Sequence, residues 1–150
     1  MRRFQFRLEQ ILKIRRYKER EWEMKLARIT GICLDLENRI EFKREEIKRS
    51  FTIKGRGVDV HRLAAGELYR TRLLREIERL TLELEERERE REKVKESYLV
   101  ASRERKVLDK LSERKEKEYY THQFREEIKV LDDLAGGVAA RKSLIAEDSF

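Results

Sequence analysis

Apolar residues recur at alternating intervals of four and three residues along positions 67–135. The residues on this pattern are Leu73, Ile77, Leu80 and Leu84 in the first half, and Val94, Tyr98, Ala101 and Leu108 in the second. This is the spacing of a coiled-coil seam, and the stretch contains neither Pro nor Gly. It therefore predicts one continuous helix that packs against a partner helix. At about 1.5 Å per residue the helix would be roughly 100 Å long, which predicts a rod.

The same spacing appears earlier in the chain and supplies the partner. Residues 4–53 carry it at Trp22, Leu26, Ile29, Cys33, Leu36, Ile40 and Ile47. A connector at residues 54–66 contains Gly55, Gly57 and Gly66, which relax the backbone and permit a reversal. The predicted fold class is therefore all-α: one domain, 1–150, formed by a long antiparallel two-helix coiled-coil hairpin. In this register Ile40 faces Ile77, and Gly136 ends the second helix before a tail at 136–150.

Two irregularities modify this seam. Charged residues occupy it at Arg15 and Glu19 on the first helix and at Arg87 and Arg91 on the second. Charge on a seam lowers stability but fixes register. The second helix is also longer than the first, so residues beyond about 115 lack an intramolecular partner over roughly 30 Å.

The first twenty residues carry more positive charge and more apolar residues than one seam can use. Eight of them are Arg or Lys, against only Glu9 and Glu19. Apolar residues spread around more than one helical face, which indicates a second contact surface. One interpretation is a surface for another protein. The alternative is an internal contact, in which Phe124, Ile128, Leu131 and Leu134 of the second helix fold over the N-terminal residues.

Composition narrows the class of protein. Charged residues make up 46% of the chain and there is no Pro, which is typical of a coiled coil and not of a globular domain. The formal net charge of +7 favours polyanionic partners, so a basic coiled-coil nucleic-acid-binding module is the alternative function. Against it, 31 acidic residues are interspersed with 38 basic ones, and no groove-reading motif is found. We therefore expect no nucleic-acid partner.

The sequence indicates no metal binding, catalysis, cofactor binding or membrane insertion. His61, His122 and Cys33 are far apart in sequence, so we expect no metal site. A two-helix rod offers no enclosed pocket in which to tune a catalytic group, so we expect no enzyme activity. Residues 136–143 approach a phosphate-binding loop but have Arg141 in place of its second glycine, so no cofactor is expected. No secretory segment or membrane-spanning run is found, which predicts a cytoplasmic protein without direct membrane insertion.

Two stretches resemble the FliJ family, the small stalk-like proteins of the bacterial flagellar type III export apparatus. One stretch is residues 4–12, Phe-Gln-Phe-Arg-Leu-Glu-Gln-Ile-Leu, followed by Arg15. The other begins with Arg-Glu-Arg-Lys-Val-Leu-Asp-Lys-Leu at 103–111 and continues through Glu118 and Tyr119 to residues 130–135. The family's closing motif usually reads Asp-Glu before its apolar pair, whereas this chain has Asp132 and Asp133.

The resemblance implies a function in flagellar protein export. It implies an antiparallel coiled coil similar to the γ stalk of rotary ATP synthases, placed at the centre of a hexameric flagellar export ATPase. The chain would couple this ATPase to the cytoplasmic domain of the export gate membrane protein, peripherally at the cytoplasmic face of the cell membrane at the flagellar base. Export chaperones are further candidate partners. The corresponding stalk of a virulence-type III secretion system is the alternative within this class.

Two sets of site residues follow from the resemblance and from the surplus of basic and apolar residues near the termini. The predicted ATPase-ring contacts are Arg3, Phe4, Phe6, Arg7, Leu8, Ile11, Arg15, Arg16, Leu131 and Leu134. The predicted export-gate contacts are Leu73, Ile77, Leu80 and Leu84. The second set coincides with the predicted seam, and a side chain that is buried against the first helix cannot also contact a partner. Of the four, we therefore expect only Leu73 and Ile77, which lie close to the predicted turn, to do both.

Overall fold

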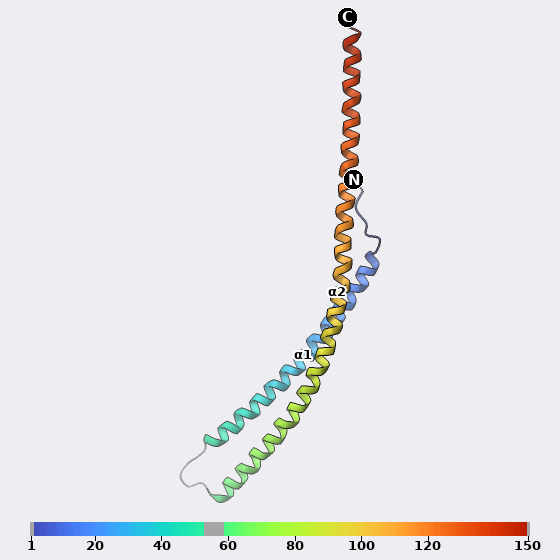
Figure 1. Ribbon diagram of the computed structural model, residues 1–150. Helices are drawn as coiled ribbons and strands as arrows, with labels where there is room; N and C mark the ends of the chain where they lie inside the picture. Colours follow the sequence, from blue (N-terminus) through green and yellow to red (C-terminus); the bar gives the residue numbers. More distant parts are fainter. Residues whose placement is uncertain (1, 53–58, 150) are drawn as a thin grey trace. The chain divides into compact units, whose positions relative to one another are not determined.

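A computed structural model describes residues 2–52 and 59–149 of the chain. It contains two helices, α1 (Glu9–Thr52) and α2 (Val60–Glu147), and no strand among these residues. The helices pack together in an antiparallel pair (Figure 1). The predicted all-α helical hairpin is confirmed. The predicted turn at residues 54–57 lies outside the described residues.

The chain divides into two compact units, which are described separately. The first unit combines Met1–Arg15 with Glu104–Phe150, and the second is Arg16–Arg103. Both helices pass from one unit into the other, so each unit contains a part of α1 and a part of α2. That the whole chain forms one domain stays a prediction.

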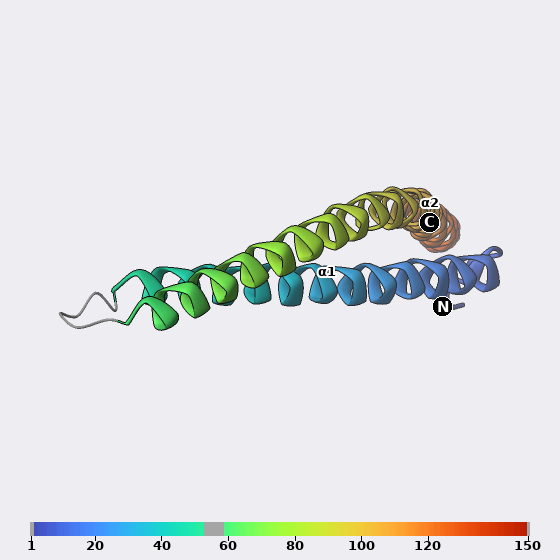
Figure 2. The same ribbon diagram turned by 90° about the horizontal axis from the view of Figure 1, so that it is seen from below.

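In the second unit, α1 and α2 lie side by side (Figure 2) and bury the predicted seam. The fully buried apolar side chains are Ile29, Cys33, Leu36, Ile40, Leu73, Leu80 and Ala101. Leu36, Ile40 and Leu80 form one cluster, against which Ile77 and Leu84 pack. Residues spaced alternately by three and four fall on one helical face, so the sequence period was sufficient to identify this core. Ser102 is also buried, although it lies beside the seam position of Ala101.

The charged seam positions are partly buried, as predicted. Glu19, Arg87 and Arg91 are half-buried in the second unit. The guanidinium group of Arg87 lies 3.0 Å from a carboxylate oxygen of Glu90 on the same helix. A long side chain in this position covers apolar surface with its stem while its charge stays near water. The seam therefore tolerates these charges without burying them.

The observed helix boundaries differ from the predicted ones. α1 begins at Glu9, not at residue 4. α2 begins at Val60, inside the predicted connector, because the Asp59 carbonyl already accepts hydrogen bonds from the Arg62 and Leu63 amides at 3.0 and 3.1 Å. At its other end α2 continues to Glu147, so the predicted end at residue 135 was wrong.

Gly136 lies inside α2 and does not end it, and the predicted tail at 136–150 is helical as far as Glu147. Each glycine inside a helix costs about 1 kcal/mol relative to alanine. The residues that follow Gly136 and Gly137 are mainly good helix formers, Ala139 and Ala140 among them, and they offset this cost. Glycine therefore did not indicate a helix end here.

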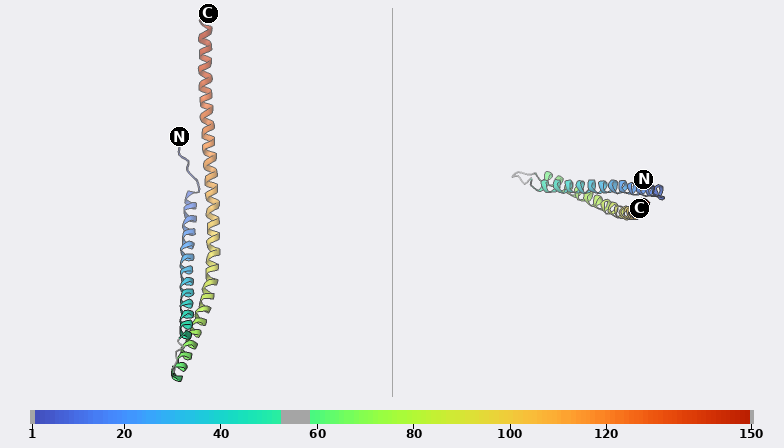
Figure 3. Two further views of the ribbon diagram at one scale, coloured as in Figure 1. Left: turned by 90° about the vertical axis from the view of Figure 1, so that its left-hand side faces the viewer. Right: turned by 90° about the horizontal axis from the view of Figure 1, so that it is seen from above.

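In the first unit, a non-helical segment of residues 2–8 runs beside α2 (Figures 1 and 3). The Phe4 ring contacts the Tyr119 ring, with 5.6 Å between their centroids. The Tyr119 hydroxyl donates a hydrogen bond of 3.0 Å to the Arg2 carbonyl. Nearby, Leu12 is fully buried, and Arg15 forms an ion pair with Glu104. These contacts attach the N-terminal segment to α2.

From residue 124 onward, no described segment of the chain covers α2. Residues 124–149 are all exposed. The alternative in which Phe124, Ile128, Leu131 and Leu134 fold over the N-terminal residues is therefore wrong. α2 remains one continuous helix, which cannot turn back, and the N-terminal segment contacts Tyr119 instead.

Candidate partner-binding surfaces

The first candidate surface consists of residues 2–8 together with the part of α2 that they cover, and we call it the terminal surface. Arg3 and Arg7 are exposed on it, whereas Phe4, Phe6 and Leu8 are half-buried. The segment and two α2 residues, Leu111 and Lys115, line a shallow hollow. The surface therefore presents positive charge next to partly accessible aromatic and aliphatic side chains, which is suited to an acidic protein partner with apolar patches.

The local sequence explains why this segment is not helical. Its apolar residues alternate with polar ones at Phe4, Phe6 and Leu8, which is the period of an extended chain and not of a helix. A turn then leads into α1, with the Glu9 amide donating a hydrogen bond of 3.1 Å to the Phe6 carbonyl. The alternation was visible in the sequence and would have placed the start of α1 after residue 8.

The predicted ATPase-ring contacts do not form one patch. Ile11 and Arg16 are exposed on α1, and Arg15 is engaged with Glu104. Leu131 and Leu134 are 64% and 62% exposed on the unpartnered part of α2. At about 1.5 Å per residue, Leu131 lies roughly 18 Å further along α2 than Tyr119, where the N-terminal segment is attached. The set therefore divides into a terminal group and a separate C-terminal group.

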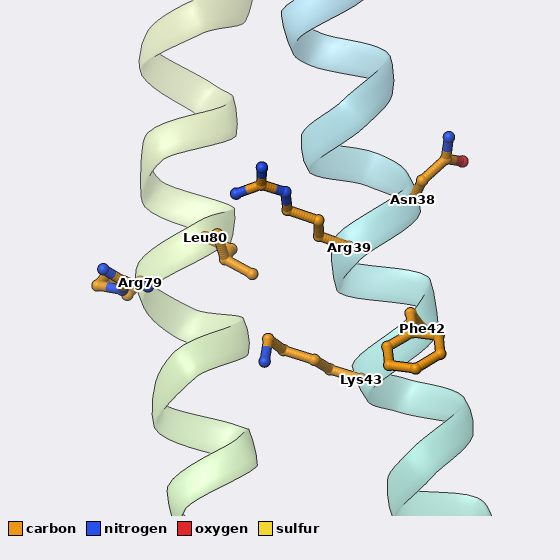
Figure 4. A pocket seen from close by; sticks show the side chains of 6 residues that line it. All are labelled: Asn38, Arg39, Phe42, Lys43, Arg79 and Leu80. Atoms are coloured by element: carbon orange, nitrogen blue, oxygen red, sulfur yellow. The ribbon is translucent and has the colours of Figure 1, made fainter.

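The predicted export-gate contacts lie in the seam. Leu73 and Leu80 are only 4% and 3% exposed, and Ile77 and Leu84 pack against the core cluster. Figure 4 shows the Leu80 side chain pointing toward α1. A partner would reach Leu73 and Leu80 only if the two helices separated, whereas Ile77 and Leu84 are half-buried. The contact with the gate stays a prediction.

A second hollow lies beside this core, over the packed helices (Figure 4). It is lined by Asn38, Arg39, Phe42, Lys43, Arg79 and Leu80. Arg39 forms an ion pair of 3.0 Å with Asp35 on its own helix, and Phe42 is exposed. Lys43 reaches across to α2, where its ammonium group donates a hydrogen bond to Glu76. The hollow combines an exposed ring with paired charges, which suits a protein contact.

The Lys43–Glu76 pair predicts a pH dependence of hairpin stability. The hydrogen bond from Lys43 lowers the pKa of Glu76 below its ordinary value of 4.5. A carboxyl group whose pKa is lower in the folded state stabilises that state above its unfolded pKa, and this stabilisation disappears as the pH falls through the folded pKa. Glu76→Gln should therefore lower the melting temperature at pH 7 but have progressively less effect below pH 4.5.

Thermal unfolding followed by circular dichroism between pH 3 and pH 7 measures this difference. Glu126→Gln is the matched control, because the pKa of Glu126 is lowered by Lys129 on the same helix and the pair joins no two helices. An equal effect of the two substitutions on the melting temperature would contradict a cross-helix role for Lys43 and Glu76.

Three further findings concern the described residues. Within residues 2–52 and 59–149, no group of three or more His, Cys, Asp or Glu side chains is arranged to hold a metal ion. Over the same residues, neither helix has a stretch that is sufficiently long and apolar to span a bilayer. Cys33 is a free thiol buried in the seam.

The fold and these surfaces define a two-helix coiled-coil protein with a non-helical N-terminal segment and a helical end that no described residue covers. The model of one family, described as the flagellar FliJ protein, matches residues 4–144. The chain belongs to this family, and it is therefore a protein associated with the flagellar export apparatus. No curated protein and no solved structure matches the chain significantly. The family favours the flagellar system over the virulence-type alternative.

Proposed function

We propose that the chain is the stalk of the flagellar export ATPase, inserted into the central opening of the hexamer by the end that carries the terminal surface. One observation supports this assignment above the others: in a member of the FliJ family, exposed Arg3 and Arg7 adjoin half-buried Phe4 and Phe6. Apolar side chains flanked by unburied positive charge are suited to an acidic, partly apolar lining.

The proposed mechanism depends on asymmetry. A ring of six identical subunits surrounds a stalk that presents unlike faces, so each subunit meets a different surface. The affinity of the stalk then depends on the nucleotide state of each subunit. A ligand shifts an equilibrium only by its differential affinity for the states involved. The stalk would in this way favour ring assembly or sequential hydrolysis, with Arg3, Arg7, Arg15 and Arg16 steering its approach.

Leu131 and Leu134 would extend the contact along α2, beyond the terminal surface. Both are exposed, and no described segment covers them. Phe4, Phe6, Leu8 and Ile11 would supply the apolar contact nearer the N-terminus. Because these two groups are separated along α2, we infer two contact regions in the ring. The terminal surface forms one of them, and Leu131 and Leu134 form the other.

The experiment that tests this function measures the turnover of the purified export ATPase with and without the chain. We expect the chain to raise ATPase turnover. The increase should become smaller as salt is added, because at physiological ionic strength salt screens the attraction between exposed charges more than about 8 Å apart, and at higher salt this distance shortens. No change in turnover at any stoichiometry would overturn the proposal.

For the export gate, we propose that Leu73, Ile77, Leu80 and Leu84 contact its cytoplasmic domain only when α1 moves away from α2. The burial of Leu73 and Leu80 and the partial burial of Ile77 and Leu84 in the closed pair support this order of events. With these two partners, we propose a location in the cytoplasm, peripherally at the cytoplasmic face of the cell membrane at the flagellar base, and export chaperones as further partners. A nucleic-acid function is less well supported, since basic side chains pair with acidic neighbours, as in Lys25–Glu21 and Arg39–Asp35.

A disulfide between the two helices should prevent binding to the gate. Ile40 belongs to the core cluster and Ile77 packs against that cluster from the other helix. We therefore expect cysteines at these two positions to be close enough for a disulfide. In a Cys33→Ser background, the oxidised Ile40→Cys/Ile77→Cys variant should lose binding to the gate domain in a pull-down or calorimetric titration. Reduction should restore it.

Cys33→Ser alone, under the same oxidising conditions, is the control. If the oxidised double variant binds the gate domain as well as the reduced one, the seam residues are not the contact. The gate would then have to bind an exposed face of the hairpin.

A further inference from the structure

The unpartnered part of α2 carries an apolar stripe of its own. Its positions are 121, 124, 128, 131, 135 and 138, occupied by Thr121, Phe124, Ile128, Leu131, Ala135 and Val138. The spacing alternates between three and four residues, as in a coiled coil. All six are exposed, Phe124 to 60% and Leu131 to 64%. A stripe of this length and regularity is a helix-packing face that lacks its helix.

This stripe does not continue the intramolecular seam. Extending the spacing of the seam past Tyr119 leads to His122, Glu126 and Lys129, which are polar and exposed. The apolar positions lie one or two residues out of step with these, so they face a different side of α2. Extending the internal helix pairing would therefore not cover the stripe. Among the described residues, no segment of the chain covers it.

We propose that the stripe pairs with the same stripe of a second copy of the chain, in an antiparallel coiled-coil dimer with a two-fold axis between residues 128 and 131. In this register Ile128 faces Leu131 of the other copy, and Phe124 faces Ala135. A large ring opposite a small side chain gives layers of similar volume along the interface. A two-fold interface repeats each of these contacts.

Charge complementarity selects this register and orientation. Arg125 and Asp132 flank the stripe at equivalent positions, one on each side of the axis. In an antiparallel pair, equivalent flanking positions face each other, so Arg125 of each copy lies opposite Asp132 of the other. A shift by one heptad would place Arg125 against Arg125 or Asp132 against Asp132. A parallel pair would place Glu127 beside Asp132, which repel each other.

The dimer does not depend on the proposed stalk function. The dimer nevertheless affects the proposed stalk function, because Leu131 belongs both to the dimer interface and to the predicted ring contact. A dimer paired through the stripe therefore cannot make the ring contact through Leu131. Tests on the isolated chain, without the ATPase, address the dimer alone, so the two proposals can fail separately.

Sedimentation equilibrium of the full chain and its charge variants tests the proposal. The wild-type chain should show a concentration-dependent monomer–dimer equilibrium. Arg125→Asp and Asp132→Arg should each weaken the dimer about tenfold, since two attractive pairs become repulsive. The double variant should restore it. A chain that remains monomeric at the highest accessible concentration, or single variants without effect, would overturn the proposal.

Asp132→Arg also reports the orientation. In a parallel dimer the new charge would lie beside Glu127 of the other copy and strengthen the association, so stronger dimerisation would overturn the antiparallel arrangement.

Cysteine cross-linking provides a second, independent measurement. In a Cys33→Ser background, Thr121→Cys/Val138→Cys should give a covalent dimer on oxidation, because residue 121 of each copy faces residue 138 of the other. These positions are roughly 25 Å apart along one helix, so the bond cannot form within a chain. Each single substitution should give no covalent dimer. Efficient cross-linking by Thr121→Cys alone would indicate a parallel pair and overturn the proposal.

Discussion

Replacing Arg3, Arg7 and Arg16 with glutamate is expected to abolish stimulation of the export ATPase while leaving the chain helical. Each replacement changes the local charge by two units, at or near the end where the terminal surface lies. Arg3 and Arg7 are exposed on that surface and Arg16 is exposed on the adjoining part of α1. Electrostatic attraction to an acidic lining would become repulsion, which lowers the association rate and penalises the bound state.

The measurement is ATPase turnover as a function of stalk concentration, with circular dichroism to verify helicity. Arg28, Arg62 and Arg75, which are exposed residues of the second unit, provide a matched triple replacement with the same change in net charge. This control should stimulate normally. Full stimulation by the Arg3, Arg7 and Arg16 variant would show that the insertion end is wrongly assigned. Loss of stimulation on deleting residues 54–57 would instead assign the ring contact to the connector between α1 and α2.

Leu80→Ala should destabilise the hairpin by about 2–4 kcal/mol, a large part of the stability of a small coiled coil. Leu80 is 3% exposed and lies in one cluster with Leu36 and Ile40. Removing its side chain discards apolar burial and leaves a cavity that two rigid helices can fill only in part. Urea unfolding followed by circular dichroism measures the change in the free energy of unfolding.

Leu82→Ala is the matched control, because Leu82 lies two residues away on the same helix and is 63% exposed. Its replacement should change the free energy of unfolding by less than about 0.5 kcal/mol. Equal destabilisation by the two substitutions would mean that the face of α2 toward α1 is not the one occupied by Leu80. It would also contradict the burial of the predicted gate contacts.

The period of apolar residues was sufficient to predict the helical pair and its core, including the charged interruptions at Arg87 and Arg91. It was insufficient at the ends of the helices. Gly136 predicts a helix end, yet α2 continues through it to Glu147. The prediction of a helix from residue 4 was wrong, because Phe4, Phe6 and Leu8 alternate with the period of an extended chain and α1 begins at Glu9. Helix ends depend on small local free energies, which the neighbouring residues readily outweigh.

The candidate site was predicted less completely than the fold. The sequence indicated that the first twenty residues contain more apolar and basic side chains than one seam can use. It did not indicate that Phe4 contacts Tyr119, or that Leu131 and Leu134 lie apart from the N-terminal residues. Contacts between residues distant in sequence leave no period to detect. They depend on the lengths of the two helices and on where the N-terminal segment meets α2.

The sequence by itself determined which face of each helix is buried, because a three-and-four spacing projects side chains to one side of an α-helix whatever surrounds it. It likewise contained the stripe from Thr121 to Val138. Only the tertiary structure decided that the first seam is occupied by α1 and that the second stripe is left exposed. The reason is physical: the described N-terminal residues contact α2 at Tyr119, whereas residues 124–149 of α2 are exposed. The spacing of a stripe specifies which side of a helix is apolar, but not which segment covers it.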